Sequence, residues 1–365
     1  MNQKKKNLLI SILFPVLLAG FGLFFFLKPD AELSISERRK LKQTPELTAK
    51  ALMDGSYFTN FEAYALDQFP MRETFRRINA FYRFRMLGQK DTNKIYLVGD
   101  QASKLEYPMN ETYVLGAAKK FNALYERYLS GMRVYYSVIP DKNYFLAKKN
   151  GYPSMDYQQL TQIMQENTRN MTYLDLFSSL TIDDYYRTDT HWKQERLSNV
   201  LAALGDGMGF AAPDLSTWQA NTYTPFYGVY CGQAALPIGS DTLTYLTGDA
   251  VNNASVWNYE TNREESVYPL EKLNGMDPYD VFLGGAAPLL KITSPKGDPA
   301  KKLILFRDSY GSSLTPLLLE AYSEIWLVDI RYISSELLGT YIDFSDQDVL
   351  FLYSTMVINN SPMLK

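Results

Sequence analysis

The sequence predicts an α/β fold whose mostly parallel sheet is covered by helices on both faces, preceded by one transmembrane helix. Short apolar runs of strand length alternate with helical stretches along most of the chain. Such alternation is typical of parallel sheets, whose strands are buried on both faces. The chain also begins with an apolar run long enough to cross a bilayer. Its 365 residues allow one large domain or two of average size.

The N-terminus is predicted to be a membrane anchor. Lysines at positions 4–6 precede an almost unbroken apolar run, Leu8–Leu27. About 20 residues at ~1.5 Å per residue span a hydrocarbon core of ~30 Å. The lysines stay inside, which directs the rest of the chain out of the cytoplasm. A cleavable signal peptide is the alternative, but Leu27–Ala31 offers no small-x-small cleavage site. We therefore expect residues 1–28 to form a basic stub and an uncleaved, single-pass anchor.

Residues 29–90 are predicted to be a juxtamembrane connector followed by docking helices. A charged segment leads into a helical pattern over Thr44–Leu87, where Phe75, Ile78 and Tyr82 recur at helical spacing. Four arginines are interleaved with them: Arg72, Arg76, Arg77 and Arg83. Two interpretations remain open. The arginines form a solvated face of a docking helix, or they contact anionic lipid headgroups near the anchor.

Residues 91–365 are predicted to be the α/β domain. The expected strands are 95–98, 134–139, 171–176, 303–306, 324–328 and 349–353. The expected helices are 114–129, 157–167, 191–204 and 311–322. The stretch at about 207–290 is rich in Gly, Pro and Asn and holds few periodic runs. We therefore expect an irregular insertion there.

Composition excludes several classes of function. The net charge of −3 gives no global basic field, so nucleic acid is not an expected partner. Cys231 and His191 are the single residues of their types. No internal disulfide can form, and zinc sites built from several Cys or His are excluded, so we expect no metal and no other cofactor. The 28 tyrosines suit a sugar-binding cleft or simple packing with the hydroxyl at the surface.

His191 is the one side chain that could act as a neutral-pH imidazole base. Asp189 precedes it by two residues, and Trp192 follows. In a tight loop this carboxylate can accept the Nδ1 hydrogen, fix the tautomer and favour the imidazolium. On its own the pattern is weak, because a lone histidine beside a tryptophan is more often a packed structural residue.

Ser309 lies where a reactive hydroxyl could be presented. The apolar run Leu303–Phe306 enters a polar turn, Arg307-Asp308-Ser309, before a stretch that favours a helix. A nucleophile at the end of a parallel strand meets the backbone N–H groups of the next helix, which can stabilise an oxyanion. The alternative is that Asp308 or Ser309 only caps the helix.

Together, these strings resemble the DHHW family, which is anchored at the envelope of Gram-positive bacteria. The motifs that carry the resemblance are Asp67-Gln68-Phe69-Pro70-Met71-Arg72, Val138-Ile139-Pro140-Asp141-Lys142, Asp189-x-His191-Trp192, Phe282-Leu283-Gly284-Gly285 and Asp308-Ser309-Tyr310-Gly311. They cover the chain from about Glu37 to Tyr353. The family is related to the alginate O-acetylation proteins, and both resemble SGNH-type esterases and acetyltransferases. The resemblance implies an SGNH-hydrolase-like three-layer domain.

The resemblance also implies a catalytic triad. Ser309 would be the nucleophile, His191 the base and Asp189 the residue that orients the base. In ordinary SGNH enzymes the serine comes first and an Asp-x-x-His string last, whereas here the order is Asp, His, Ser. This matches the permuted order of the alginate acetylation relatives, and triads are recognised by geometry rather than by order.

The sequence departs from the family pattern at two places. Thr190 stands where the name DHHW implies a histidine, and Ala286 follows Gly284-Gly285 where an SGNH oxyanion hole usually has an asparagine. A plain turn is the alternative interpretation of Gly284-Gly285. The candidates for the oxyanion hole and for substrate binding are Tyr310, Gly311, Gly284, Gly285, Asn143 and Trp192.

The resemblance therefore predicts a serine-type O-acetyltransferase or carbohydrate esterase acting on envelope or exported polysaccharide, with a membrane-bound acyltransferase as a further partner. The alternative is an inactive SGNH-like protein that binds polysaccharide or serves as a scaffold in an export complex. The distance from Ser309 Oγ to His191 Nε2 distinguishes the two, because catalysis requires hydrogen-bond reach.

Overall fold

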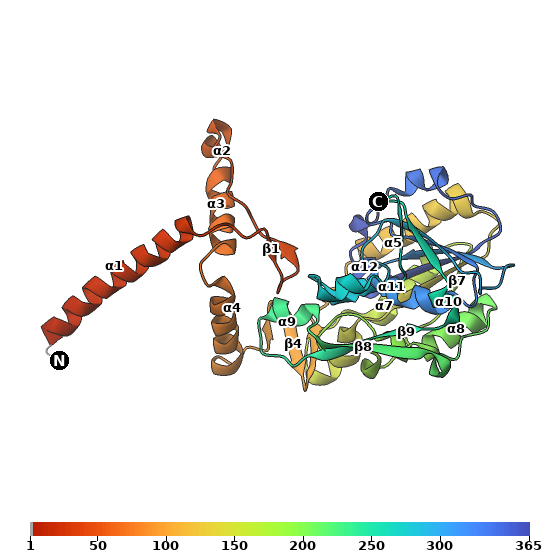
Figure 1. The fold of residues 1–365 in the computed structure, drawn as a ribbon, viewed down its shortest axis with the longest axis horizontal. Coiled ribbons are helices and arrows are strands. Elements are labelled where there is room, and N and C mark those ends of the chain that lie inside the picture. The colour runs from red at the N-terminus through yellow and green to blue at the C-terminus, as the bar shows by residue number, and fades with distance from the viewer. Residues whose placement is uncertain (1–2) are drawn as a thin grey trace. The chain divides into compact units, whose positions relative to one another are not determined.

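Residues 3–365 are described by a computed structural model (Figure 1), which divides into two compact units. The first unit is Met1–Asn93 with Cys231–Pro237. The second is Lys94–Tyr230 with Ile238–Lys365. A short segment of the expected insertion thus belongs with the N-terminal part of the chain.

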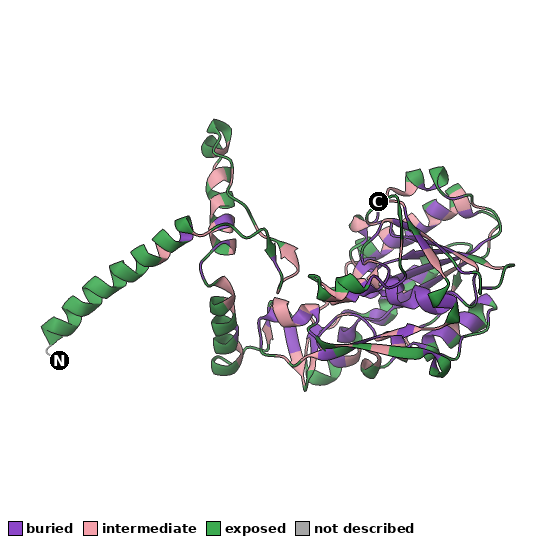
Figure 2. Ribbon diagram, viewed as in Figure 1, coloured by how far each residue is buried: buried purple, intermediate pink, exposed green. Residues whose placement is uncertain are grey.

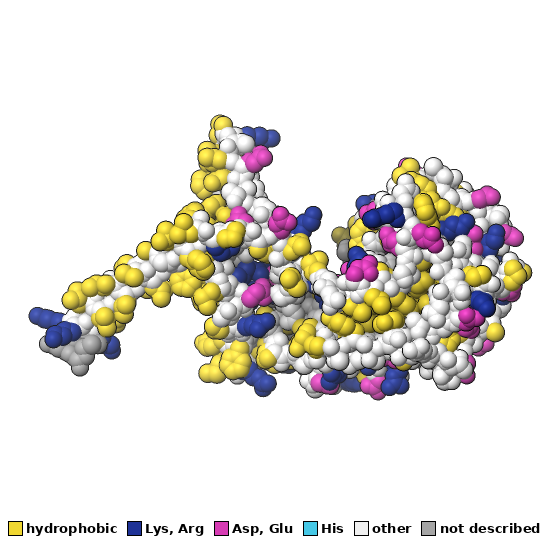
Figure 3. All heavy atoms as spheres, viewed as in Figure 1, with side chains coloured by type: hydrophobic (Ala, Val, Ile, Leu, Met, Phe, Trp, Pro, Cys, Tyr) yellow, Lys and Arg dark blue, Asp and Glu magenta, His cyan; other side chains and the backbone are white. Residues whose placement is uncertain are grey.

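The first unit consists mainly of helices. Its elements are α1 (Gln3–Leu27), β1 (Leu33–Ser34), β2 (Arg39–Lys40), α2 (Ala49–Met53), α3 (Ser56–Asp67), α4 (Arg72–Phe81), a π-helical turn (Tyr82–Met86) and β3 (Asp91–Thr92). Among residues 3–365, α1 alone is long and apolar enough to cross a membrane, with 25 residues and a mean hydropathy of 2.5. Its residues are exposed along most of the helix (Figure 2), and almost all of their side chains are apolar (Figure 3). These properties are what a membrane span requires.

A cluster of ion pairs holds the connector of the first unit against its helices. Glu37 pairs with Arg72 at 2.6 Å and with Arg76 at 3.3 Å. Arg39 binds both carboxylate oxygens of Asp67, at 2.6 and 2.8 Å. We call this group, completed by Glu73 beside Arg76, the connector cluster.

The core of the second unit is an eight-stranded sheet. In sheet order its strands are β11 (Arg263–Glu265), β10 (Ser255–Asn258), β12 (Leu289–Thr293), β14 (Glu324–Val328), β13 (Lys302–Arg307), β15 (Asp348–Ser354), β6 (Val134–Ile139) and β7 (Thr172–Tyr173). The strands from β14 to β7 are parallel, and β12, β10 and β11 extend the sheet in antiparallel pairs. The predicted α/β fold with a mostly parallel sheet is confirmed.

The antiparallel edge differs from the sequence prediction. Strands β10 and β11 lie inside 207–290, the stretch expected to be irregular. The same stretch holds a two-stranded ribbon, β8 (Gln219–Phe226) and β9 (Asp241–Thr247). These strands are short or carry mostly polar side chains, so no apolar run marks them in the sequence. Pairing with a neighbouring strand, rather than local propensity, defines them.

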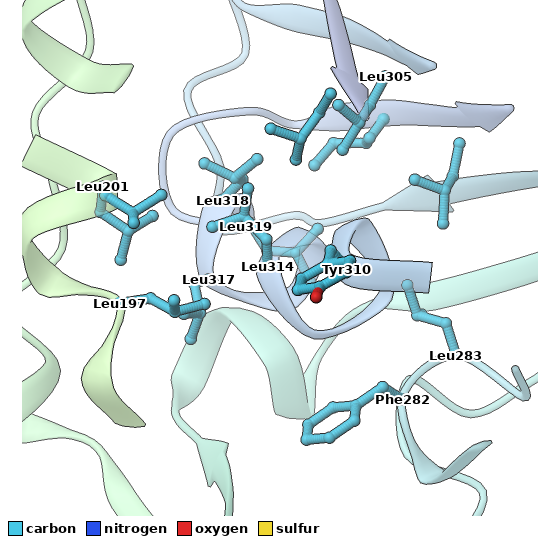
Figure 4. Packing of buried hydrophobic residues seen from close by; sticks show 14 of the residues in the cluster. Leu197, Leu201, Phe282, Leu283, Leu305, Tyr310, Leu314, Leu317, Leu318 and Leu319 are labelled. Atoms are coloured by element: carbon cyan, nitrogen blue, oxygen red, sulfur yellow. The ribbon is translucent and has the colours of Figure 1, made fainter. Parts of the chain in front are cut away.

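Both faces of the sheet are buried, which gives three layers. Along β13, Leu303 and Leu305 point into one apolar core, and Ile304 and Phe306 point into the other. This alternation follows from the two-residue period of a strand. The helices α8 (Ser198–Met208) and α11 (Ser309–Leu314) cover the first face, where leucines of both pack together (Figure 4). The helices α5 (Glu111–Leu124) and α7 (Tyr157–Asn167) cover the second.

The remaining elements are short. They are β4 (Ile95–Val98), β5 (Gln101–Lys104), α6 (Lys142–Leu146), α9 (Val229–Ala234), α10 (Asp249–Asn252) and α12 (Thr355–Ile358). β4 was expected among the alternating strands, but it pairs with β5 in a hairpin outside the main sheet. The helix expected over 311–322 ends at Leu314 and continues as a 3-10 turn, Thr315–Leu318. Pro316 lies in that turn and lacks the N–H that an α-helix would need.

Candidate active site

A tight loop presents the Asp-x-His string. Tyr185 and Trp192 form an antiparallel bridge, and the Tyr186 N–H donates to the His191 carbonyl at 3.1 Å, which closes the loop. Inside it, the Asp189 carboxylate accepts the His191 backbone N–H at 3.1 Å. The loop is therefore held both by its own backbone and by the side chain of Asp189.

Ser309 is the first residue of α11, and Asp308 alone separates it from the end of β13. Asp308 is the N-cap: one carboxylate oxygen accepts the Tyr310 N–H at 3.1 Å, and the other accepts the Ser354 N–H at 2.7 Å. Because Ser354 ends the neighbouring strand β15, Asp308 fixes the turn to the sheet. Capping is thus the role of Asp308, and the partly exposed Ser309 hydroxyl is left for other contacts.

The three residues of the predicted triad lie in one chain of hydrogen bonds. His191 Nδ1 lies 2.7 Å from an Asp189 oxygen, and His191 Nε2 lies 2.8 Å from Ser309 Oγ, across 118 positions of sequence. The carboxylate can only accept, so Nδ1–H donates to it, and in the neutral imidazole Nε2 is then the acceptor for the Ser309 hydroxyl. Asp189 also accepts the Val229 N–H at 2.7 Å. The carboxylate is fully buried, and His191 is nearly so.

The ring of Tyr279 covers His191 and was missed in the sequence. The two rings stack with centroids 3.8 Å apart and planes 7° apart. The Tyr279 hydroxyl donates to Ser313 Oγ at 2.8 Å, so the ring is fixed at both ends. Burial raises the pKa of Tyr279 well above its usual value, so this hydroxyl stays a neutral donor. The nearest indication in the sequence is the family motif that begins at Phe282, just after it.

Trp192 and Tyr310, two of the substrate-binding candidates, are instead buried clamps between the histidine loop and α11. Trp192 Nε1 donates to the Tyr310 carbonyl at 3.1 Å and to Ser313 Oγ at 2.9 Å. The Tyr310 hydroxyl donates to the Thr190 carbonyl at 2.7 Å. These contacts join the loop that carries the imidazole to the helix that carries the serine, and both side chains are almost fully buried. Thr190, the departure from the family pattern, lies 3.3 Å from the Tyr310 hydroxyl through its Oγ.

Most of the oxyanion-hole candidates have backbone or side-chain groups already engaged. The Gly311 N–H donates to the Asp308 carbonyl at 3.0 Å, and the Gly285 N–H donates to the Phe282 carbonyl at 3.2 Å. A Cβ at Gly311 would meet Arg307 Cβ at 2.6 Å, so the close approach of α11 to β13 requires glycine there.

Asn143 and Gly284 complete the set of candidates. Asn143 is fully buried and accepts the Tyr96 hydroxyl at 2.9 Å. Its amide donates to the Pro153 carbonyl at 3.3 Å. The amide of Asn143 is therefore used inside the fold. Gly284 has a left-handed backbone with φ of 75°, which favours glycine.

Lys142 binds the backbone of the loop that carries His191. The residue is 1% exposed, and its ammonium donates to the carbonyls of Tyr186, Arg187 and Asp189, at 2.6, 2.9 and 3.2 Å. Burial lowers the pKa of Lys142 to about 7, and the carboxylates of Asp189 and Asp241 act in the opposite direction. In the sequence, Lys142 is noted only as part of a family motif, because no residue near it along the chain indicates this contact.

Comparison with known proteins shows that the chain has a known fold. No family model and no curated protein sequence matches the chain. Among solved structures, a DHHW family protein from Eubacterium siraeum matches with a TM-score of 0.61 at 20% identity, covering 75% of this chain and 95% of that one. The chain has the fold of the DHHW family protein. The resemblance inferred from the motifs is thus confirmed at the level of the fold.

PatB1 of Bacillus cereus shares this DHHW fold. It has been solved alone and with a sulfonyl adduct, with TM-scores of 0.57 and 0.58, 14% identity and 72% of this chain covered. These matches cover 96% and 95% of the PatB1 chains. A weaker likeness, with a TM-score of 0.43 and 12% identity, is to the O-acetyltransferase domain of Pseudomonas putida AlgJ. It covers 73% of this chain and 92% of that one.

Proposed function

We propose that this chain is a membrane-anchored enzyme outside the cytoplasm that transfers or removes acetyl groups on cell-envelope or exported polysaccharide. The observation that supports this most strongly is the chain of hydrogen bonds from Asp189 through His191 to Ser309, at 2.7 and 2.8 Å. A nucleophile within reach of a base that is itself oriented by a third group is the arrangement that covalent acyl transfer requires.

The proposed reaction has two halves. Ser309 Oγ attacks the acyl carbonyl carbon while its proton passes to His191 Nε2, and the buried Asp189 carboxylate stabilises the imidazolium. The bond to the leaving alcohol then breaks, and His191 returns the proton to it. An acceptor hydroxyl then attacks the acetyl-serine and gives its proton to His191. The bond between the acetyl group and Ser309 Oγ breaks, and His191 returns the proton to Ser309. Water as acceptor gives an esterase, and a sugar hydroxyl gives an O-acetyltransferase.

The Ser309 N–H is the proposed donor to the oxyanion. Within residues 3–365 no hydrogen-bond partner is found for this N–H, whereas the N–H groups of Tyr310 and Gly311 are used by Asp308. It opens α11, where backbone donors point toward the end of β13. An aligned donor of this kind contributes roughly 3–4 kcal/mol to the transition state. Gly284 is the proposed source of a second backbone donor.

The geometry favours an enzyme over an inactive scaffold. A distance of 2.8 Å from His191 Nε2 to Ser309 Oγ lies within hydrogen-bond reach. PatB1, which has the same fold, carries a sulfonyl adduct, the product expected when a sulfonyl reagent meets an activated nucleophile. An enzyme outside the cytoplasm has no access to acyl thioesters made inside, so the transferase form of the proposal includes a membrane-bound acyltransferase that delivers the acetyl group.

The test is hydrolysis of a chromogenic acetyl ester by the full chain in detergent. We expect turnover by the wild type and a loss of at least ~100-fold in Ser309→Ala. Ser312→Ala is the matched control, because this buried serine lies on the same helix without a hydrogen-bond partner within residues 3–365. Equal rates for wild type and Ser309→Ala would overturn the proposed function.

A further inference from the structure

We propose that the exposed apolar faces of α3 and α4 lie in the outer leaflet of the membrane that α1 crosses. The proposal concerns the first unit and needs α1 to be a membrane span. It does not depend on any chemistry at Ser309.

A continuous apolar stripe runs along α4 and the π-helical turn that follows it. Its large side chains recur at intervals of three or four positions and are between 43% and 69% exposed. They are Met71, Phe75, Ile78, Tyr82 and Met86. Five such side chains in one row are more than a water-facing helix ordinarily shows, and apolar faces of this kind mark interaction surfaces.

The same face of the first unit touches the membrane helix. The ring of Phe21 in α1 stacks on Phe69 at 5.6 Å and meets Phe75 edge-on at 5.9 Å. Phe25 of α1 meets Tyr64 of α3 at 5.5 Å. Since Phe75 belongs to the apolar stripe, the stripe is on the side of α4 that faces α1.

These contacts fix a depth. Phe21 lies six residues before Leu27, the end of α1, so it is about 9 Å inside that end at ~1.5 Å per residue. If Leu8–Leu27 fills the hydrocarbon core, the rings of Phe69 and Phe75 lie at acyl-chain depth too. The junction of α3 and α4 is then inserted in the leaflet, and the stripe continues from it along α4.

The helix α3 presents a similar surface. Tyr57, Phe61 and Tyr64 form a row of ring contacts along it, and Phe58 and Leu66 are exposed. Hydrophobic side chains gather along α3 and α4 in Figure 3. Helices with exposed apolar and aromatic side chains beside a membrane span lie along the membrane plane, as interfacial helices do.

The arginines divide into two groups. Arg72 and Arg76 belong to the connector cluster, so their charges are already matched by Glu37 and Glu73. Arg77, Arg83 and Arg85 are exposed. Basic residues beside an apolar aromatic face favour an interfacial helix on anionic lipid. The exposed arginines are thus the ones proposed to contact lipid headgroups, whereas Arg72 and Arg76 join α4 to the connector.

The test places a fluorescent label at single cysteines in the full chain, in vesicles of phosphatidylcholine and phosphatidylglycerol with brominated acyl chains. The background is Cys231→Ser, which removes the native thiol. The label at Ile78→Cys reports on the stripe, and the label at Arg77→Cys reports on the neighbouring exposed position off the stripe. The label at Leu13→Cys, in the middle of α1, shows whether the anchor is inserted.

We expect the labels at positions 13 and 78 to be quenched by the brominated lipid at least about twofold, and the label at 77 to be quenched little. Quenching at 13 with none at 78 would overturn the proposal, and would make a protein partner the occupant of the stripe. Hydrolysis of the acetyl ester by the same variants in detergent reports separately on the proposed function, because none of these positions belongs to the site.

Discussion

Two groups of charged residues, one in each unit, show how burial decides what a charge can do. In the connector cluster, Arg39 is 40% exposed and holds Asp67 by two hydrogen bonds of 2.6 and 2.8 Å. The bond from Arg39 lowers the pKa of Asp67 to about 2. In the second unit, Asp189 and Lys142 are fully buried, and burial lowers the pKa of Lys142 to about 7.

The difference lies in the partners. The connector cluster matches each charge with an opposite charge in partial contact with water, which ties segments together with little net energy. Around the site, charges meet backbone groups instead: Asp189 accepts two N–H groups, and Lys142 donates to three carbonyls. Such contacts orient a reactive group, and leaving one of them unmade is costly. The predictions below test this contrast.

The largest effect is expected from Asp189→Asn. The amide cannot fully replace a carboxylate that accepts from His191 Nδ1 and two N–H groups. We expect kcat for the acetyl ester to fall by roughly 10³-fold or more, because the tautomer and the imidazolium lose their support. Asp183→Asn, an exposed carboxylate of the preceding turn, is the control and should keep the wild-type rate. A loss of less than tenfold in Asp189→Asn would contradict a triad.

Lys142→Met should lower kcat by up to about 100-fold, with little change in KM. Lys142 does not reach the surface, so it can act only by positioning the loop that carries His191, and small displacements of reacting groups cost about this much. Rates are to be normalised to folded protein, because unfolding alone would lower kcat. Lys148→Met in the exposed turn after α6 is the control. A rise in KM at constant kcat would assign Lys142 to substrate binding instead.

The stability of the wild type should rise relative to Lys142→Met between pH 7 and pH 9. Burial lowers the pKa of Lys142 in the folded chain to about 7, well below its ordinary value of 10.5. The unfolded chain therefore binds more protons in this window, and a rise in pH favours folding. The cost of burying the ammonium is fully present below pH 7. The free energy of unfolding, from denaturant titrations, should gain about 1 kcal/mol per pH unit over the variant. Parallel curves would contradict the low pKa.

The smallest effect is expected from Arg39→Met in the connector cluster. Exposed ion pairs contribute about 0–1 kcal/mol, so the free energy of unfolding should fall by less than about 1 kcal/mol and hydrolysis should not change. A fall in kcat comparable with that of Lys142→Met, or a fall in the free energy of unfolding well above 1 kcal/mol, would break the contrast between the two clusters.

The fold could be predicted where mostly apolar runs of strand length occur. Such runs mark β6, β14 and β4, and the bounds expected for them are those of the structure, although β4 pairs outside the main sheet. The edge strands β10 and β11 could not be predicted, since Ser255–Asn258 and Arg263–Glu265 are held by pairing with neighbours. For the same reason, the sequence did not indicate that 231–237 belongs with the first unit.

The site could be predicted where its chemistry is local. Asp189 stands two positions before His191, and Ser309 follows an apolar strand. Three other groups approach the site only through the tertiary fold: Tyr279, the Val229 N–H and Lys142. For example, Lys142 contacts the Tyr186 carbonyl across 44 positions of sequence. Trp192 follows His191 and Tyr310 follows Ser309 in the sequence, and both were expected to meet substrate. In the structure both are buried and bonded to each other through Trp192 Nε1 and the Tyr310 carbonyl, a contact that the sequence does not indicate.

Covalent labelling with a sulfonyl fluoride tests the central claim, that His191 activates Ser309, most directly. Intact-mass and peptide mass spectrometry should show one sulfonyl adduct on Ser309 in the wild type, with labelling slowed at least ~100-fold in His191→Ala. An adduct that forms equally fast in His191→Ala, or that forms elsewhere and leaves Ser309 unmodified, would contradict the account.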